Sequence, residues 1–141
     1  KDIKTFHWTF NYKEMKRIKK CLYKERIMSN KLYWGNIPFY IDIYPKGVNN
    51  EEYVEIFLNC DARGFNVSKL DIWYALNVRQ VGYRFITSNV YEDFPVGCGI
   101  RKNSIKSFEL MDLAQLSIDI TFKIRSIYDK SGNNIPTDIW H

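Results

Sequence analysis

The sequence has few of the residues that usually carry catalysis or bind metals. Among its 141 residues there are only two histidines, His7 and His141, which stand near opposite ends of the chain. Its three cysteines, Cys21, Cys60 and Cys98, are widely spaced, and no Cys-x-x-Cys pair occurs. The odd count and the spacing argue against a zinc motif and a disulfide framework. We therefore expect no metal, no cofactor and reduced thiols, as in an intracellular protein of the nucleus or cytoplasm.

Motifs of the common enzyme classes are also missing. The sequence contains no Gly-x-Ser-x-Gly elbow and no phosphate-binding loop. Cys98 stands between Gly97 and Gly99, but nothing in the sequence links a histidine base to it, so we interpret it as an ordinary thiol. Asp112 and Asp119 are interpreted as solvated surface carboxylates rather than as an acid–base pair. We expect no catalytic residues and no enzymatic activity.

Long hydrophobic runs are absent, because charged residues interrupt the sequence every few positions, and no membrane-spanning segment is predicted. The net charge is +5, and much of the excess comes from one basic segment. It comprises Lys13, Lys16, Arg17, Lys19, Lys20, Lys24 and Arg26. Such a segment could attract nucleic acid or an acidic membrane surface, but no nucleic-acid motif accompanies it. We interpret it as a solvated, lysine-rich surface and expect neither nucleic acid nor membrane as a partner.

What the sequence has in abundance is alternation of apolar and polar residues with a period of two, which is typical of half-buried strands. It predicts strands over residues 6–10, 39–44, 52–59, 68–78, 82–86 and 118–125. Strands at these intervals, with little helix, indicate an all-β fold, an antiparallel β-sandwich of about eight strands. Phe6, Trp8, Phe39 and Phe122 lie in the right phase for its core.

The segments between these strands carry helix and turn signals. Asn11 and Glu14 predict a capping box before a short basic helix with Ile18 and Leu22 on one side; an irregular basic loop is the alternative. A blurred alternation at residues 73–74 indicates a bulge or burial on both faces. Pro95 and two glycines favour a long loop over residues 87–99.

The chain is predicted to form a single domain over residues 1–128. Residues 129–141 read as a C-terminal linker or tail. The first residues form neither an initiator methionine nor a signal peptide, so we expect an excerpt of a longer protein.

Aromatic residues are numerous, with nine Phe, ten Tyr and four Trp, and some of them fall outside the predicted core pattern. Phe57 shares its strand face with Glu55, while Tyr91 and Phe94 fall in the predicted loop. Such aromatics either anchor a bound protein or pack beneath loops, and the pattern alone favours neither.

Five segments occur in an order that is known from one family. They read Phe-His-Trp-Thr-Phe-Asn at 6–11, Ser-Asn-Lys-Leu-Tyr-Trp-Gly at 29–35, Phe-Tyr-Ile-Asp-Ile-Tyr-Pro-Lys-Gly at 39–47, Tyr-Val-Glu-Ile-Phe-Leu at 53–58 and Tyr-Arg-Phe at 83–85. In this order and spacing, residues 3–128 resemble the MATH domain, the meprin and TRAF-C homology domain. The resemblance is closest to the speckle-type POZ protein branch, where a BTB domain follows, and it implies a sandwich of the TRAF-C/MATH type.

This resemblance implies a domain that binds short extended segments of substrate proteins across one sheet. By position it assigns peptide contacts to Phe57, Tyr83, Tyr91 and Phe94, and one more to Leu70 or, depending on the bulge, to Asp71. It implies the substrate-binding module of a cullin-type ubiquitin ligase adaptor, with the cullin engaged through a BTB domain outside this chain. The alternatives are a TRAF-like signalling adaptor and the targeting domain of a ubiquitin protease.

Overall fold

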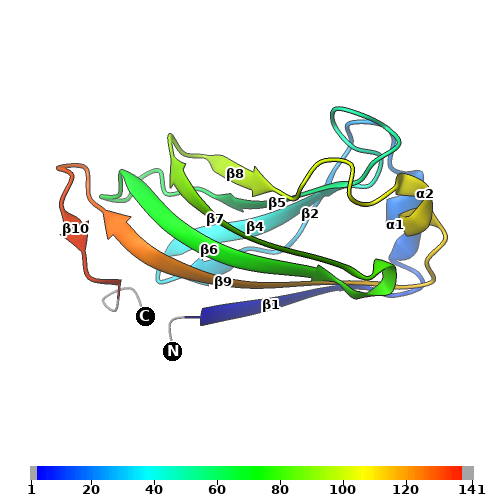
Figure 1. The fold of residues 1–141 in the computed structure, drawn as a ribbon, viewed down its shortest axis with the longest axis horizontal. Coiled ribbons are helices and arrows are strands. Elements are labelled where there is room, and N and C mark those ends of the chain that lie inside the picture. Colours follow the sequence, from blue (N-terminus) through cyan, green and yellow to red (C-terminus); the bar gives the residue numbers. More distant parts are fainter. Residues whose placement is uncertain (1–2, 138–141) are drawn as a thin grey trace.

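The computed structural model describes residues 3–137, and it contains two antiparallel β-sheets packed face to face (Figure 1). In chain order the elements are β1 (Ile3–Phe10), α1 (Met15–Lys20), β2 (Ile27–Met28), β3 (Leu32–Trp34), β4 (Ile37–Tyr44), β5 (Glu55–Cys60), β6 (Lys69–Val78), the 3-10 helix η1 (Arg79–Val81), β7 (Tyr83–Glu92), β8 (Val96–Gly99), α2 (Ser107–Met111), β9 (Leu116–Tyr128) and β10 (Asn134–Ile135). The predicted all-β architecture is confirmed. No helix in this described part is long and apolar enough to cross a membrane.

The two sheets are built from strands that are distant in the sequence. The first sheet has the order β1-β9-β6-β7, with β10 paired to β9; the second has the order β2-β4-β5-β8, with β3 paired to β4. Residues 3–137 thus form ten strands, where about eight were predicted. The additional strands β2, β3 and β10 contain only two or three residues, too few to show a period of two. The TRAF-C/MATH type of the sandwich stays a prediction.

The core lies between the sheets and is filled by the inward side chains of the long strands. Along β6, every second residue from Leu70 to Val78 is buried. Phe122 on β9 is fully buried, with its ring centroid 4.8 Å from that of Phe39. Trp8 packs against the core but is only partly buried, because β1 is an edge strand. The predicted strand phase is confirmed: Phe39 and Phe122 are fully buried, and Phe6 and Trp8 are partly buried against the core.

The short helix α1 begins as the sequence predicts. The N–H of Glu14 donates to Asn11 Oδ1 at 2.9 Å, and the N–H of Asn11 donates to Glu14 Oε1 at 3.1 Å. The helix has only six residues, and its buried side consists of Met15 and Ile18. The predicted position of Leu22 on that side is wrong, because the helix ends before it and leaves Leu22 63% exposed.

The predicted loop over residues 87–99 is also wrong. β7 continues through this segment because it pairs with β6 along its whole length, from Tyr83 opposite Val78 to Glu92 opposite Lys69. A turn then leads into β8, which pairs with β5. The polar run Thr-Ser-Asn at 87–89 interrupts the period-two pattern, so the sequence did not reveal that the strand continues.

The structure also differs from the sequence-based expectation at the predicted bulge and in the C-terminal segment. The irregularity expected at residues 73–74 is a register shift between β6 and β9 at Asp71 and Ile72, and Tyr74 is an ordinary buried residue. The described part of the predicted tail forms a turn, in which Asp129 Oδ1 accepts the N–H groups of Ser131 and Asn133, and then strand β10 of the first sheet. Residues 1–2 and 138–141, including His141, lie outside the described residues.

Phe122→Ala should lower the free energy of unfolding by about 3–5 kcal/mol, because it removes a fully buried ring from the centre of the core. Ile86→Ala, at a half-exposed position on β7, is the control and should change it by less than about 0.5 kcal/mol. Chemical denaturation of both variants measures the difference. Similar losses in the two variants would contradict the packing described here.

Candidate functional site

Strand β8 forms one edge of the second sheet, opposite the edge formed by β2 and β3 (Figure 1). Within the described residues its only strand neighbour is β5, with Leu58 opposite Cys98 and Phe57 opposite Gly99. The N–H of Ile100 donates to the carbonyl of Ile56, which fixes the alternation of the antiparallel ladder. Gly97 and Gly99 therefore occupy the positions whose backbone N–H and C=O groups point away from β5, toward the open edge.

The two glycines of β8 let side chains from β5 lie across its backbone. A Cβ atom at Gly99 would stand 2.7 Å from the Phe57 ring, and one at Gly97 would overlap the amide oxygen of Asn59. Only glycine leaves room for these side chains without a shift. The side chains of Phe57 and Asn59 therefore lie directly over the β8 backbone on the outer face of the sheet and form a wall along it.

A hollow of about 330 Å³ lies beside this wall on the outer face of the second sheet. Its lining consists of Arg26, Tyr40, Asp42, Tyr44, Phe57, Asn59, Pro95, Val96 and Gly97. The β4 and β5 residues lie together because alternate side chains of paired strands project to the same face. The ring centroids of Tyr44 and Phe57 are 5.7 Å apart, edge to face, so the hollow has an aromatic wall.

The floor of the hollow carries an ion pair. Arg26 Nη1 donates to Asp42 Oδ2 at 2.9 Å, and Asp42 is only 3% exposed. Burial raises the pKa of the Asp42 carboxyl above its ordinary value, while the Arg26 guanidinium and the Asn59 amide act in the opposite direction. Asp42 in turn raises the pKa of Arg26.

Two buried polar atoms in this floor lack hydrogen-bond partners. Asp42 Oδ1 and Asn59 Nδ2 are both buried, and neither makes a hydrogen bond of good geometry, although the Asn59 amide lies close enough to favour the charged carboxylate. Burial also raises the pKa of Tyr40, with the Asp42 charge as the next cause. The hollow thus combines an aromatic wall with a polar floor that holds two buried polar atoms without hydrogen-bond partners.

The predicted site residues do not converge on one open face. Phe57 lines the hollow described above. Leu70 and Tyr91 lie in the core, and the Tyr91 hydroxyl donates to the Leu58 carbonyl at 2.6 Å. Phe94 lines a different hollow. Tyr83 lies on β7 in the first sheet and stacks on Phe85.

Strand phase explains why the predicted peptide contacts on β6 and β7 do not lie on an open face. Tyr91 lies eight residues after Tyr83 on one continuous strand, so both side chains point to the inside of the sandwich rather than toward a ligand on the outer face. Asp71, the alternative to Leu70, forms an ion pair with Arg125 at 3.0 Å on the outer face of the first sheet.

Sequence reasoning missed most residues of the hollow. Tyr40, Asp42 and Tyr44 alternate with apolar residues in the predicted strand 39–44, and this period of two places them on the same face as Phe57 once β4 and β5 are paired. Arg26 reaches the site from the segment between α1 and β2, and no local signal in the sequence links it to Asp42.

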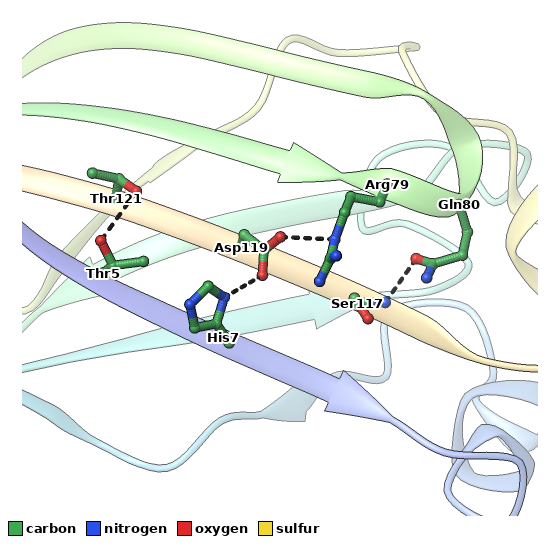
Figure 2. A network of polar contacts seen from close by, with 7 residues as sticks. All are labelled: Thr5, His7, Arg79, Gln80, Ser117, Asp119 and Thr121. Atoms are coloured by element: carbon green, nitrogen blue, oxygen red, sulfur yellow. Dashed lines mark hydrogen bonds and ion pairs between the residues drawn. The ribbon is translucent and has the colours of Figure 1, made fainter.

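The groups weighed for catalysis have other roles in the structure. Cys98 Sγ lies 2.7 Å from Asn89 Nδ2, while His7 belongs to β1 in the other sheet. Asp119 Oδ1 lies 2.6 Å from His7 Nδ1, and Asp119 Oδ2 lies 3.0 Å from Arg79 Nε (Figure 2). These contacts tie β1, β9 and η1 together. Within residues 3–137 no group of three His, Cys, Asp or Glu side chains is arranged to hold a metal ion.

Comparison with known proteins gives no independent assignment. The sequence matches no protein-family model and no curated protein.

Gly99→Ala should destabilise the protein by about 1–3 kcal/mol, because the added methyl group displaces the Phe57 ring. In a Phe57→Ala background the same change should cost much less, since the obstructing ring is gone. Thermal or chemical unfolding of the four proteins completes the cycle. Additive losses would show that Phe57 does not lie over β8.

The raised pKa of Asp42 predicts a pH-dependent stability difference between the wild type and Asp42→Asn. A raised pKa in the folded state means that folding favours the protonated carboxyl. Its contribution to stability is therefore fully present below the unfolded-state pKa, near the ordinary value of 3.8, and is lost as the pH rises through the folded-state pKa.

Relative to Asp42→Asn, the wild type should become less stable as the pH rises from the ordinary range of a carboxyl toward neutrality. Taking the difference between the two proteins cancels the other titrating groups. Unfolding free energies of both proteins, measured across this pH range, test the sign of the change in their stability difference. A wild type that gains stability on the variant with rising pH would show that Arg26 outweighs burial.

Proposed function

We propose that this chain is a peptide-recognition domain that binds short extended segments of other proteins along β8. The observation that carries the proposal is the free, glycine-containing edge of β8 directly beside a hollow with aromatic walls. An exposed strand edge offers backbone hydrogen bonds to any extended chain, and an adjacent hollow adds a preference for particular side chains.

The geometry of the edge suits a single added strand. The outward N–H and C=O groups of Gly97 and Gly99 can exchange hydrogen bonds with a ligand backbone in extended conformation. Alternate ligand side chains then point to the face that Phe57 and Asn59 occupy, and one of them can enter the hollow of about 330 Å³. Backbone pairing supplies affinity, and this pocket supplies selectivity.

The resemblance to the MATH domain supports the same class of function and extends it. It suggests that the bound segments belong to substrates of a cullin-type ubiquitin ligase, that a BTB domain elsewhere in the protein engages the cullin, and that this domain itself performs no catalysis. A TRAF-like signalling adaptor or the targeting domain of a ubiquitin protease would use the same edge. The sequence that flanks this domain distinguishes the three.

Peptides selected from a displayed random library should bind the domain with dissociation constants in the micromolar range, about −8 kcal/mol. Phe57→Ala should weaken a selected peptide at least about tenfold, because the ring is the aromatic wall nearest the edge. Tyr33→Ala, which removes an exposed tyrosine on β3, is the control and should leave affinity unchanged. Calorimetry measures all three proteins.

The role of the backbone is tested separately with N-methylated peptides. Two peptides are compared, each N-methylated at every second residue. In one peptide the methyl groups replace the N–H hydrogens that face β8; in the other they replace those that face solvent. Only one phase should abolish binding. Equal binding of both methylated peptides, or full affinity in Phe57→Ala, would place the site elsewhere.

A further inference from the structure

The net charge of the protein is concentrated at one end of the sandwich. Residues 12–26 contain seven basic and two acidic residues, an excess of five that equals the net charge of the whole chain. The remaining residues are balanced. This segment comprises α1 and its flanking turns, at the end of the sandwich far from β10 (Figure 1).

The fold directs this charge outward. Because Met15 and Ile18 form the buried side of α1, its basic residues are left in solvent. Arg17, Lys20 and Arg26 line one hollow of about 490 Å³ together with Glu25. Arg26 is already paired with Asp42, so Arg17 and Lys20 are the cations that the hollow offers to an anionic group.

Exposed apolar side chains stand within this basic segment. Leu22 and Tyr23 lie in a turn after α1, and both are exposed. The turn is held in place: the N–H of Leu22 donates to Glu25 Oε1 at 2.7 Å, and the N–H of Lys24 donates to the Gly47 carbonyl at 2.9 Å. A leucine and a tyrosine are thus presented to solvent on an ordered turn.

At the same end, α2 exposes Phe108, with Lys106 Nζ 5.7 Å from its ring centroid. This second helix repeats the combination of an apolar side chain with a lysine beside it. Two separate elements therefore expose apolar side chains at one end of the molecule: Leu22 and Tyr23 within the basic segment, and Phe108 beside Lys106 and Glu109.

We propose that this end of the domain docks on a membrane surface rich in anionic lipid headgroups. Lysines and arginines near a surface of anionic lipid each favour binding, and apolar side chains that enter the headgroup layer add a second, independent contribution. The charge alone would also suit nucleic acid, but Leu22 and Phe108 gain nothing from a phosphate backbone, whereas both gain from a lipid interface. This revises the sequence-based expectation that no membrane is a partner.

Docking in this way is compatible with ligand binding at β8. The basic end carries α1 and α2, while β8 lies along the side of the sandwich (Figure 1). A domain bound through its helical end would keep the β8 edge open to solvent. The proposal is independent of the proposed peptide site, and either can fail without the other.

The test is co-sedimentation of the purified chain with vesicles of phosphatidylcholine, with and without phosphatidylserine. We expect binding only to the vesicles that contain phosphatidylserine, weakening as salt is added. The triple variant K16Q/K19Q/K20Q should reduce the partition coefficient about 100-fold, roughly fivefold for each lysine. The matched control K31Q/K123Q/K130Q removes three exposed charges away from the helical end and should retain partitioning within about twofold of the wild type.

A second variant separates insertion from charge. Leu22→Ser with Tyr23→Ser leaves the net charge unchanged and should still reduce partitioning about tenfold or more, because the inserted apolar area is lost. Circular dichroism verifies that each variant is folded. Equal losses in both triple variants, or unchanged partitioning of the serine variant, would overturn the proposal. Preferential binding of single-stranded RNA that survives the serine changes would overturn it in favour of nucleic acid.

Discussion

The pairing of β5 between β4 and β8 is the constraint on which the candidate site depends. It places Asp42, Phe57 and Gly99 in one row across three strands, all on the outer face of the second sheet. The same strand directs Ile56 and Leu58 into the core, so the register cannot slip by one residue without moving the core side chains into solvent. Burial of the inner side chains thus fixes which residues lie together on the outer face. Glycine is required at position 99 because the Phe57 ring leaves no room for a Cβ atom there.

The sequence pattern predicted the strands in which one face is buried and the other is not, because their apolar and polar residues alternate. β1, β4, β6 and β9 alternate over most of their length, and the Asn11–Glu14 pairing before α1 is a local signal that needs no tertiary context. β8 and the part of β7 after Ile86 were predicted as loop, because β7 is held there by its pairing with β6 despite polar residues and β8 consists partly of glycine. In both, tertiary pairing outweighs local propensity.

The candidate site was predictable only where strand phase decides it. Phe57 was predicted to point away from the core stripe, and it lines the hollow. Leu70 and Tyr91 were assigned through resemblance, and the structure places both in the core because each lies in phase with buried neighbours on its strand. Arg26 required the three-dimensional fold, since the residues that bring it to Asp42 form no regular element longer than two residues.

The central claim is that β8 accepts an extended chain at its open edge. Amide hydrogen exchange followed by NMR tests it residue by residue, because the N–H groups of Gly97 and Gly99 point outward while that of Cys98 is already paired with β5. On addition of a bound peptide, exchange at Gly97 and Gly99 should slow strongly, with little change at residues on the outer face of the first sheet. Protection that appears elsewhere, with Gly97 and Gly99 exchanging as before, would contradict the account.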